Sequence, residues 1–359
     1  RAEHGRLAYL RDVFLGLKAP HESDPVKLES ISFFNARLDE AQKKAVKMFL
    51  ESPDVCMIQG PPGTGKTTVL VEVIRQAVAQ GKFVFATAPS NAACDHLLSW
   101  LVRDGVPALR LGHPARIMTH LRAHTLDFKV SNHPYGTAVD EKQAEMARLR
   151  LKLERRRERR PLSWEEKDAT RQAIRGLENE VRDLASDIFL QVLREAPVMV
   201  GTHAGAGDPV LEGKKYDVLV MDESAQATEP SSWIPLLRAE RVVLAGDHFQ
   251  LPPTIRSPEA ERKGLGVSLF ERLYDMVPDR FTTMLDCQYR MHESIMNFPS
   301  REFYRGSLMA HASVRSHKLA DLGHVKAARE TKETFVFLDT AGRGFEESVE
   351  QGSESRYNV

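Results

Sequence analysis

The chain is 359 residues long, more than one ordinary hydrophobic core accommodates, and this length predicts two domains. Its 50 basic side chains balance 50 acidic ones, which argues against a uniformly basic nucleic-acid coat and leaves room for a local basic groove. With 42% hydrophobic residues and no apolar run near the roughly 20 residues that a membrane-spanning helix needs, the composition predicts a globular protein with no membrane partner.

The first 112 residues predict an accessory element followed by alternating strands and helices. Residues 1–37 contain one short amphipathic stretch and a linker, and we expect them to end an upstream element. From residue 38, "LDEAQKKAVKMFL" has helical spacing with Asp39 as a possible N-cap. The apolar runs "DVCMIQG", "KFVFATA" and "ALRLG" predict buried strands separated by amphipathic helices. This alternation predicts an α/β fold with a parallel sheet that binds ligands at the carboxyl ends of its strands.

The alternation stops over residues 113–195, where two long charged helical patterns flank Pro161. Ser163 and Glu166 form a capping box at the start of the second pattern, so we expect an inserted antiparallel helical hairpin. Strands resume with "PVMVGTH", "YDVLVMDE" and "RVVLAGD". The predicted first domain therefore spans residues 38–112 and 196–254. From residue 255, the helical patterns "SLFERLYDM" and "MHESIMNF" and the strand patterns "FTTMLDC" and "TFVFLDT" predict the start of a second α/β domain over 255–359.

The stretch "GPPGTGKT" lies between a predicted strand and a predicted helix and matches the phosphate-binding loop pattern in full. Glycines let backbone N–H groups surround phosphate oxygens at a helix N-terminus. Lys66 is predicted to reach the β- and γ-phosphates of ATP, and Thr67 to bind Mg²⁺. The nucleotide-binding residues predicted in this loop are Gly60, Pro61, Pro62, Gly63, Thr64, Gly65, Lys66, Thr67 and Thr68.

Two further strand ends carry polar side chains that suit phosphate chemistry. Asp222 and Glu223 end the apolar run "VLVM", and burying adjacent carboxylates is unfavourable unless a cation compensates. Asp222 is the expected Mg²⁺ partner and Glu223 the expected general base for the attacking water. Gln250, in "LAGDHFQLPPT", is predicted to contact the γ-phosphate or that water.

Six motifs follow one another along the chain. They are Gln42 in "LDEAQKKAV", "GPPGTGKTT", "TAPSNAACDHL", "DESAQ", "GDHFQLPPT" and "QYRMHESIMNFPS". In this order they resemble the motifs of the superfamily 1B helicases of the up-frameshift type. The resemblance covers about residues 31–357, apart from much of the helical insertion, and "RLGHPAR", "WIPLL" and "FLDTAG" are most similar to the immunoglobulin mu-binding branch.

This resemblance implies two RecA-like domains that close on ATP and move 5′ to 3′ along single-stranded RNA or DNA. It implies that Gln42 reads the adenine, that Tyr289 stacks on it, and that Arg290 reaches the γ-phosphate from the second domain. Ser90 and Asn91 would contact the nucleic-acid backbone, and Thr202 is a weaker candidate for the same role. Short polar groups at strand ends suit a grip on phosphates that does not depend on base sequence.

Some alternatives stay open. The basic run "RLRLKLERRRERR" suggests a nucleic-acid clamp, but a solvated, self-paired helix face is the simpler interpretation for any one arginine. The chain begins without Met, and a Gly-Arg-Glu signature and a further ATP-site arginine of the family do not occur before Val359. We therefore expect a fragment with a partial second domain that binds nucleotide but hydrolyses it poorly. A nucleotide-dependent binding module is thus an alternative to a helicase, whereas "QYRMH" argues against a kinase or an AAA-type ATPase.

The three cysteines are far apart and lack the spacing of zinc ligands, which favours free thiols in a reducing compartment. The first residues lack the apolar core of a signal peptide, so we expect a cytoplasmic protein, with the nucleus as a second setting. We also expect a monomeric motor. Protein partners and a preference between RNA and DNA are not indicated by the sequence. The cysteines are Cys56, Cys94 and Cys287.

Overall fold

The computed structural model describes residues 4–154, 163–337, 339–344, 347–349 and 356–358. The chain divides into two compact units, one over residues 1–285 and one over residues 286–359. In the described part of the chain, no helix is both long enough and apolar enough to cross a membrane.

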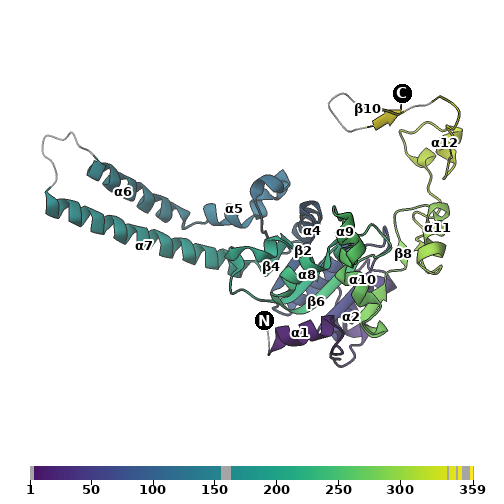
Figure 1. The fold of residues 1–359 in the computed structure, drawn as a ribbon, viewed down its shortest axis with the longest axis horizontal. Helices are drawn as coiled ribbons and strands as arrows, with labels where there is room; N and C mark the ends of the chain where they lie inside the picture. Colours follow the sequence, from purple (N-terminus) through teal and green to yellow (C-terminus); the bar gives the residue numbers. More distant parts are fainter. Residues whose placement is uncertain (1–3, 155–162, 338, 345–346, 350–355, 359) are drawn as a thin grey trace. The chain divides into compact units, whose positions relative to one another are not determined.

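The first unit is built on a seven-stranded sheet in the order β3-β4-β2-β5-β6-β1-β7, and every neighbouring pair is parallel. Figure 1 labels β2, β4 and β6 of this sheet. Parallel pairing places all carboxyl ends of the strands at one edge of the sheet, as predicted for a ligand-binding edge. The α/β fold class is therefore confirmed. The strands are β1 (Val55–Gln59), β2 (Val84–Ala88), β3 (Ala108–Arg110), β4 (Val198–Thr202), β5 (Tyr216–Met221), β6 (Ala239–Gly246) and β7 (Thr282–Met284).

Helices cover both faces of this sheet because its strands are apolar on both sides. Alternate side chains of each strand belong to different apolar clusters: Ile58 of β1 faces one cluster, and Met57 faces the other. The first cluster contains α2 (Glu40–Glu51), α3 (Lys66–Ala79) and α4 (Asn91–Arg103). The second contains α1 (Arg6–Phe14), the end of α7 (Trp164–Glu195), α8 (Glu229–Leu236) and α10 (Leu269–Tyr274), while α9 (Pro258–Ala260) contributes no residue to either cluster.

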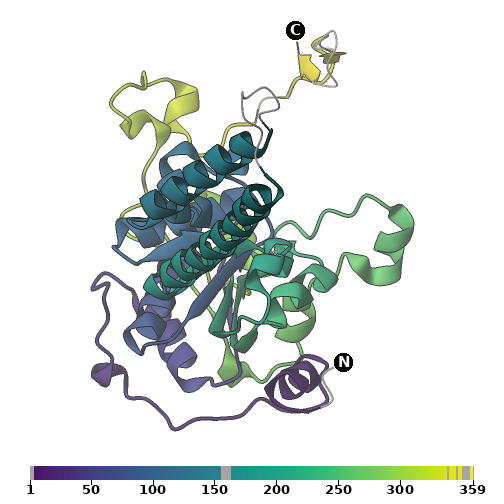
Figure 2. The same ribbon diagram turned by 90° about the vertical axis from the view of Figure 1, so that its left-hand side faces the viewer.

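The predicted inserted hairpin is present as α6 (Gly136–Glu154) and α7, preceded by the short α5 (Leu126–Ser131). α6 and α7 run side by side in both views (Figures 1 and 2). Ion pairs link the two helices: Arg150 with Glu178 at 2.7 Å, and Lys142 with Glu180. These contacts agree with the interpretation of a self-paired helix face. Pro161 and the arginines of the basic run beyond residue 154 lie outside the described residues.

The second unit contains α11 (Glu293–Phe303), α12 (Arg329–Lys332) and two small sheets. β8 (Cys287–Gln288) pairs in parallel with β9 (Met309–Ala310), and β10 (Glu347–Val349) pairs antiparallel with β11 (Arg356–Asn358).

Two strand predictions near the second unit need correction. The predicted strand "FTTMLDC" divides: β7 joins the first unit's sheet beside β1, and Cys287 starts β8 in the second unit. The predicted strand "TFVFLDT" is not a strand in its described residues, because the Phe335 and Phe337 side chains are 79% and 77% exposed and no described strand pairs with this segment.

Residues 255–285 were expected to begin the second domain, yet they belong to the first compact unit. Leu269, Phe270 and Leu273 of α10 are buried in the same apolar cluster as Leu219 and Leu244 of the sheet. The predicted domain boundary near residue 254 therefore differs from the boundary near residue 285 that the contacts of the chain give, because α10 covers the first unit's sheet.

Candidate nucleotide site

The phosphate-binding loop follows β1 and leads into α3 at the carboxyl edge of the sheet. Gly63 and Gly65 have φ values of 79° and 81°, a left-handed conformation that favours glycine. At Gly60 the constraint is space, since a Cβ atom built there would lie 2.0 Å from Cγ of Lys66. The glycines therefore give the loop the shape that the sequence pattern predicts.

Lys66, the first residue of α3, holds its ammonium group at the mouth of this loop. Nζ donates to the carbonyl oxygen of Gly60 at 2.9 Å and lies 3.8 Å from Oε1 of Glu223. The structure thus brings together the predicted phosphate-binding cation and the predicted general base, although 157 residues separate them in sequence (223 − 66). Lys66 follows β1 and Glu223 follows β5, and only β6 separates these two strands in the sheet.

Asp222 and Glu223 follow β5 and have different environments. Asp222 is 3% exposed, and burial together with the neighbouring Glu223 raises its pKa to about 6 despite the opposing effect of Lys66. Its Oδ1 accepts a hydrogen bond from the backbone N–H of Glu223 at 2.9 Å. Glu223 has a φ of 50°, unusual for a residue with a side chain, and strain of this kind concentrates at functional sites. Its Oε2 accepts from Nε2 of Gln226 at 3.1 Å.

The raised pKa of Asp222 provides a test of whether this edge suits Mg²⁺. A buried carboxylate with too little compensating positive charge is stabilised by a bound cation. Oxygen donors are what Mg²⁺ prefers, and it commonly takes only one or two from protein alongside phosphate oxygens. Asp222 and the hydroxyl of Thr67 are the donors predicted from the sequence, and their binding of Mg²⁺ stays a prediction. In the described part of the chain, this edge included, no group of three or more His, Cys, Asp or Glu side chains that could hold a metal ion occurs.

Gln42 is 5% exposed and joins the start of α2 to the phosphate-binding loop. Its Oε1 accepts from the backbone N–H of Asp39, and the side chain of Asp39 accepts from the N–H of Gln42, so the two residues form a capping box. Nε2 of Gln42 donates to the carbonyl oxygen of Thr64 at 3.0 Å. The residue expected to read adenine therefore also supports the loop, and adenine recognition stays a prediction.

Gln250 lies beside the same edge and contacts residues that the sequence analysis did not single out. Its Nε2 donates to Oδ2 of Asp247 at 2.8 Å, and Oδ1 of Asp247 lies 3.3 Å from Nε2 of Gln59. Gln59 and Asp247 are each 2% exposed at the ends of β1 and β6. The signal that identified Asp222, a polar residue at the end of an apolar strand, could have identified both.

The three residues expected to contact nucleic acid lie at the carboxyl ends of β2 and β4, where each also has a local structural role. Ser90 is the N-cap of α4, since its Oγ accepts from the N–H of Ala93. Oδ1 of Asn91 accepts from the buried Arg110 at 2.9 Å. Oγ1 of Thr202 accepts from the N–H of Gly205 at 3.0 Å. Their contact with nucleic acid stays a prediction.

Tyr289 and Arg290 lie in the second unit directly after β8, where both side chains are exposed. The buried Gln288 shapes this turn: its Oε1 accepts from the N–H groups of Arg290 and Met291, and its Nε2 donates to the carbonyl oxygen of Met291. The ring of Tyr289 lies 4.6 Å from that of His311, measured between centroids. Gln288 thus has a structural role that the sequence did not reveal, and the ATP-site roles of Tyr289 and Arg290 stay predictions.

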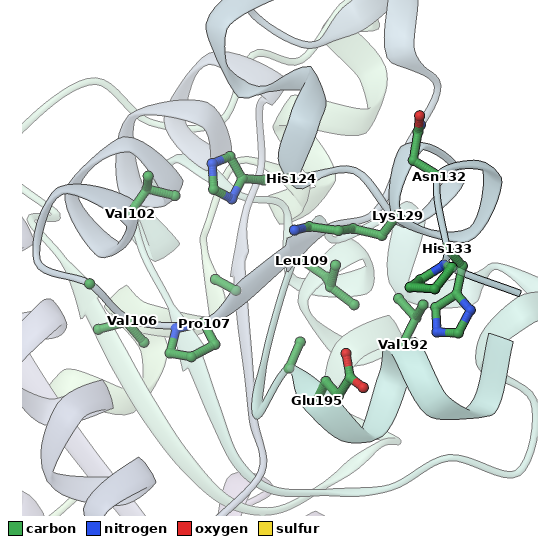
Figure 3. A pocket seen from close by; sticks show the side chains of 14 residues that line it. Val102, Val106, Pro107, Leu109, His124, Lys129, Asn132, His133, Val192 and Glu195 are labelled. Carbon is green, nitrogen blue, oxygen red and sulfur yellow. The ribbon is translucent and has the colours of Figure 1, made fainter. Parts of the chain in front are cut away.

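A separate pocket of about 500 Å³ lies where the insertion meets the sheet (Figure 3). Leu109 of β3, His124, Lys129 of α5, and Val192 and Glu195 of α7 are among the residues that line it. It borders the start of β3, so it lies at the amino edge of the sheet, away from the phosphate-binding loop. Burial and the nearby Lys129 charge lower the pKa of His124.

Comparison with known proteins identifies the family of the chain. Two AAA domain families match the chain, one over residues 37–258 and the other over residues 265–359. The chain belongs to the superfamily 1B helicases. It is 39% identical to the rat DNA-binding protein SMUBP-2 over 358 residues, which cover 99% of the chain and 36% of that protein. It is 34% identical to the DNA polymerase alpha-associated DNA helicase A of Schizosaccharomyces pombe, covering 95% of the chain and 50% of that protein.

A third relative is the regulator of nonsense transcripts 1 of Dictyostelium discoideum, at 35% identity over 77% of the chain and 20% of that protein. The chain thus spans only about a third to a half of the length of SMUBP-2 and helicase A. Among solved structures, an arterivirus helicase in complex with DNA matches 73% of the chain and 41% of its own chain, at 14% identity and a TM-score of 0.36. That score is too low to support a fold comparison.

Proposed function

We propose that this helicase binds Mg²⁺ and ATP at the carboxyl edge of its sheet, hydrolyses ATP, and moves 5′ to 3′ along single-stranded RNA or DNA. The observation that carries the proposal is the cluster of Lys66, Glu223 and the buried Asp222. A cation at a glycine-rich loop suits phosphate binding, and two carboxylates with different environments suit metal binding and proton transfer.

In this mechanism each residue has a distinct task. Backbone N–H groups of the loop and Lys66 bind the phosphates, and Thr67 and Asp222 hold Mg²⁺, which supplies positive charge to the phosphate oxygens when bound. Glu223 accepts a proton from the attacking water, and Gln250 orients that water or the γ-phosphate. Gln42 and Tyr289 bind the adenine, and Arg290 contributes positive charge at the γ-phosphate.

The nucleic-acid grip is proposed for Ser90, Asn91 and Thr202. They lie at the same edge of the sheet as the ATP site, so a movement at the phosphates is transmitted over a short distance to the bound nucleic acid. The names of the relatives support a nucleic-acid partner, since they include a DNA-binding protein, a DNA helicase and a regulator of nonsense transcripts. We further propose a monomeric motor in the cytoplasm or nucleus.

Streptavidin displacement tests the direction of movement. A strand that carries biotin at its 3′ end should lose streptavidin in the presence of ATP, whereas a strand that carries biotin at its 5′ end should keep it. Lys66→Ala is the control, because it removes the phosphate-binding cation. Displacement from the 5′ end alone would contradict the proposed direction. ATP-dependent strand binding without displacement or turnover would instead support the nucleotide-dependent binding module.

A further inference from the structure

A line of hydrogen bonds connects helix α10 to Gln250 through the buried ends of two strands. The hydroxyl of Tyr274, the last residue of α10, donates to Oε1 of Gln59 at 2.8 Å. Nε2 of Gln59 donates to Oδ1 of Asp247 at 3.3 Å, and Oδ2 of Asp247 accepts from Nε2 of Gln250 at 2.8 Å. All four residues belong to the first compact unit.

These bonds have one consistent polarity. Because the Tyr274 hydroxyl donates to the carbonyl oxygen of the Gln59 amide, the amide's N–H groups face the carboxylate of Asp247. The reversed amide would place its oxygen against that carboxylate, which is repulsive. At 2% exposure each, Gln59 and Asp247 have little access to water as a substitute partner, so the Tyr274 donor and the Asp247 acceptor together hold the amide of Gln59 in this orientation.

We propose that Tyr274 is a positioning residue for ATP turnover, which acts through Gln59 and Asp247 to hold the side chain of Gln250 in one conformation. The inference rests on the proposed role of Gln250 at the γ-phosphate. α10 lies in the chain between the loop that contains Gln250 and β7, the last strand before the second unit. A change in the position of α10 is thereby transmitted to Gln250.

Replacing the Tyr274 hydroxyl alone is feasible because its ring is held independently. The ring lies 4.9 Å from that of His248 and 5.8 Å from that of Phe270, measured between centroids. Tyr274→Phe keeps this packing and removes the donor. Tyr9→Phe is a matched control: its hydroxyl contacts the carbonyl oxygen of Ala19 and the carboxylate of Asp54, outside this line of bonds.

Single-turnover hydrolysis of radiolabelled ATP by the 359-residue chain, with a single-stranded oligonucleotide present, tests the proposal because it measures slow rates as well as fast ones. Tyr274→Phe should lower the rate about fivefold, the effect of one hydrogen bond, and should change ATP affinity less than about twofold. In a Gln250→Ala background the same substitution should have no further effect, since the two residues act on one conformation. Tyr9→Phe should leave the rate unchanged.

A second measurement does not require turnover. In nuclear magnetic resonance spectra, Tyr274→Phe should shift the side-chain amide signals of Gln250 and Gln59, and Tyr9→Phe should not. An unchanged Gln250 signal, or a rate loss that multiplies with that of Gln250→Ala, would overturn the proposal. If the unsubstituted chain neither binds nor hydrolyses ATP, the proposed function fails, while the spectra still decide whether Tyr274 positions Gln250.

Discussion

At the scale of single residues, the most informative group is Asp222, because burial raises its pKa to about 6. A free aspartate titrates near pH 4, so between about pH 4 and pH 6 the unfolded chain releases a proton that the folded chain keeps. Folding stability from this group is present below pH 4 and is lost as the pH rises through 6. At neutral pH the buried carboxyl of Asp222 is ionised, and a cation bound beside it is favoured because it compensates this charge.

Asp222→Asn should stabilise the protein at pH 7.5 in EDTA by up to about 3 kcal/mol, because the amide stays neutral and still accepts from the N–H of Glu223. The gain should shrink toward zero near pH 4. Urea unfolding at both pH values measures this. A variant that is no more stable than the parent at pH 7.5 would contradict the assigned burial effect.

Substitutions of Lys66 and Glu223 should affect ATP binding and ATP hydrolysis differently, even though the two side chains form an ion pair. Lys66→Ala should abolish ATP binding, because it removes the cation at the loop. Glu223→Gln should keep binding and reduce hydrolysis by about 10²-fold or more, since the amide cannot accept the proton from water. Fluorescent nucleotide titration and ATPase assays measure the two effects, and equal loss of binding in both variants would contradict the assigned roles.

At the scale of elements, Arg110 joins β3 to α4. Its side chain is fully buried, Nε donates to Asp95 at 2.8 Å, and further N–H groups donate to Asn91 and to the carbonyl oxygen of Leu111. A buried ion pair is sensitive to loss of one partner because the remaining charge stays uncompensated.

Arg110→Met should therefore lower the free energy of unfolding by about 3 to 5 kcal/mol. The double substitution Arg110→Met with Asp95→Leu should recover part of that loss, because it removes the unpaired carboxylate. Urea unfolding of the two variants is the measurement. A double variant less stable than Arg110→Met alone would show that Asp95 contributes mainly through its bond to the N–H of Met118.

Elements with a strong local signal were predictable from the sequence. Asp39 is the N-cap expected of it, Ser163 begins a helix with the expected capping box, and the apolar run before Gly60 is a buried strand. "TFVFLDT" has an equally apolar pattern yet forms no strand in its described residues, because strand formation needs a neighbour that the pattern does not specify. Lys66, Asp222 and Glu223 were identifiable from motifs, whereas the Tyr274 contact with Gln59 depends on packing between residues distant in sequence.

At the scale of the whole molecule, the proposed ATP turnover depends on Lys66 and Glu223 and on the proposed roles of Tyr289 and Arg290. A helicase motor hydrolyses ATP faster when it is bound to a nucleic-acid strand, whereas a nucleotide-dependent binding module does not. Stimulation by single strands is thus the property that separates a helicase motor from a nucleotide-dependent binding module.

The most direct measurement is the ATPase rate of the 359-residue chain with and without single-stranded RNA or DNA, beside Lys66→Ala and Arg290→Ala. The rate should rise when a strand is added, be abolished by Lys66→Ala and fall strongly in Arg290→Ala, since an arginine at the γ-phosphate can contribute about 10³-fold or more. An ATPase rate that no strand stimulates, or one that Lys66→Ala leaves intact, would contradict the account.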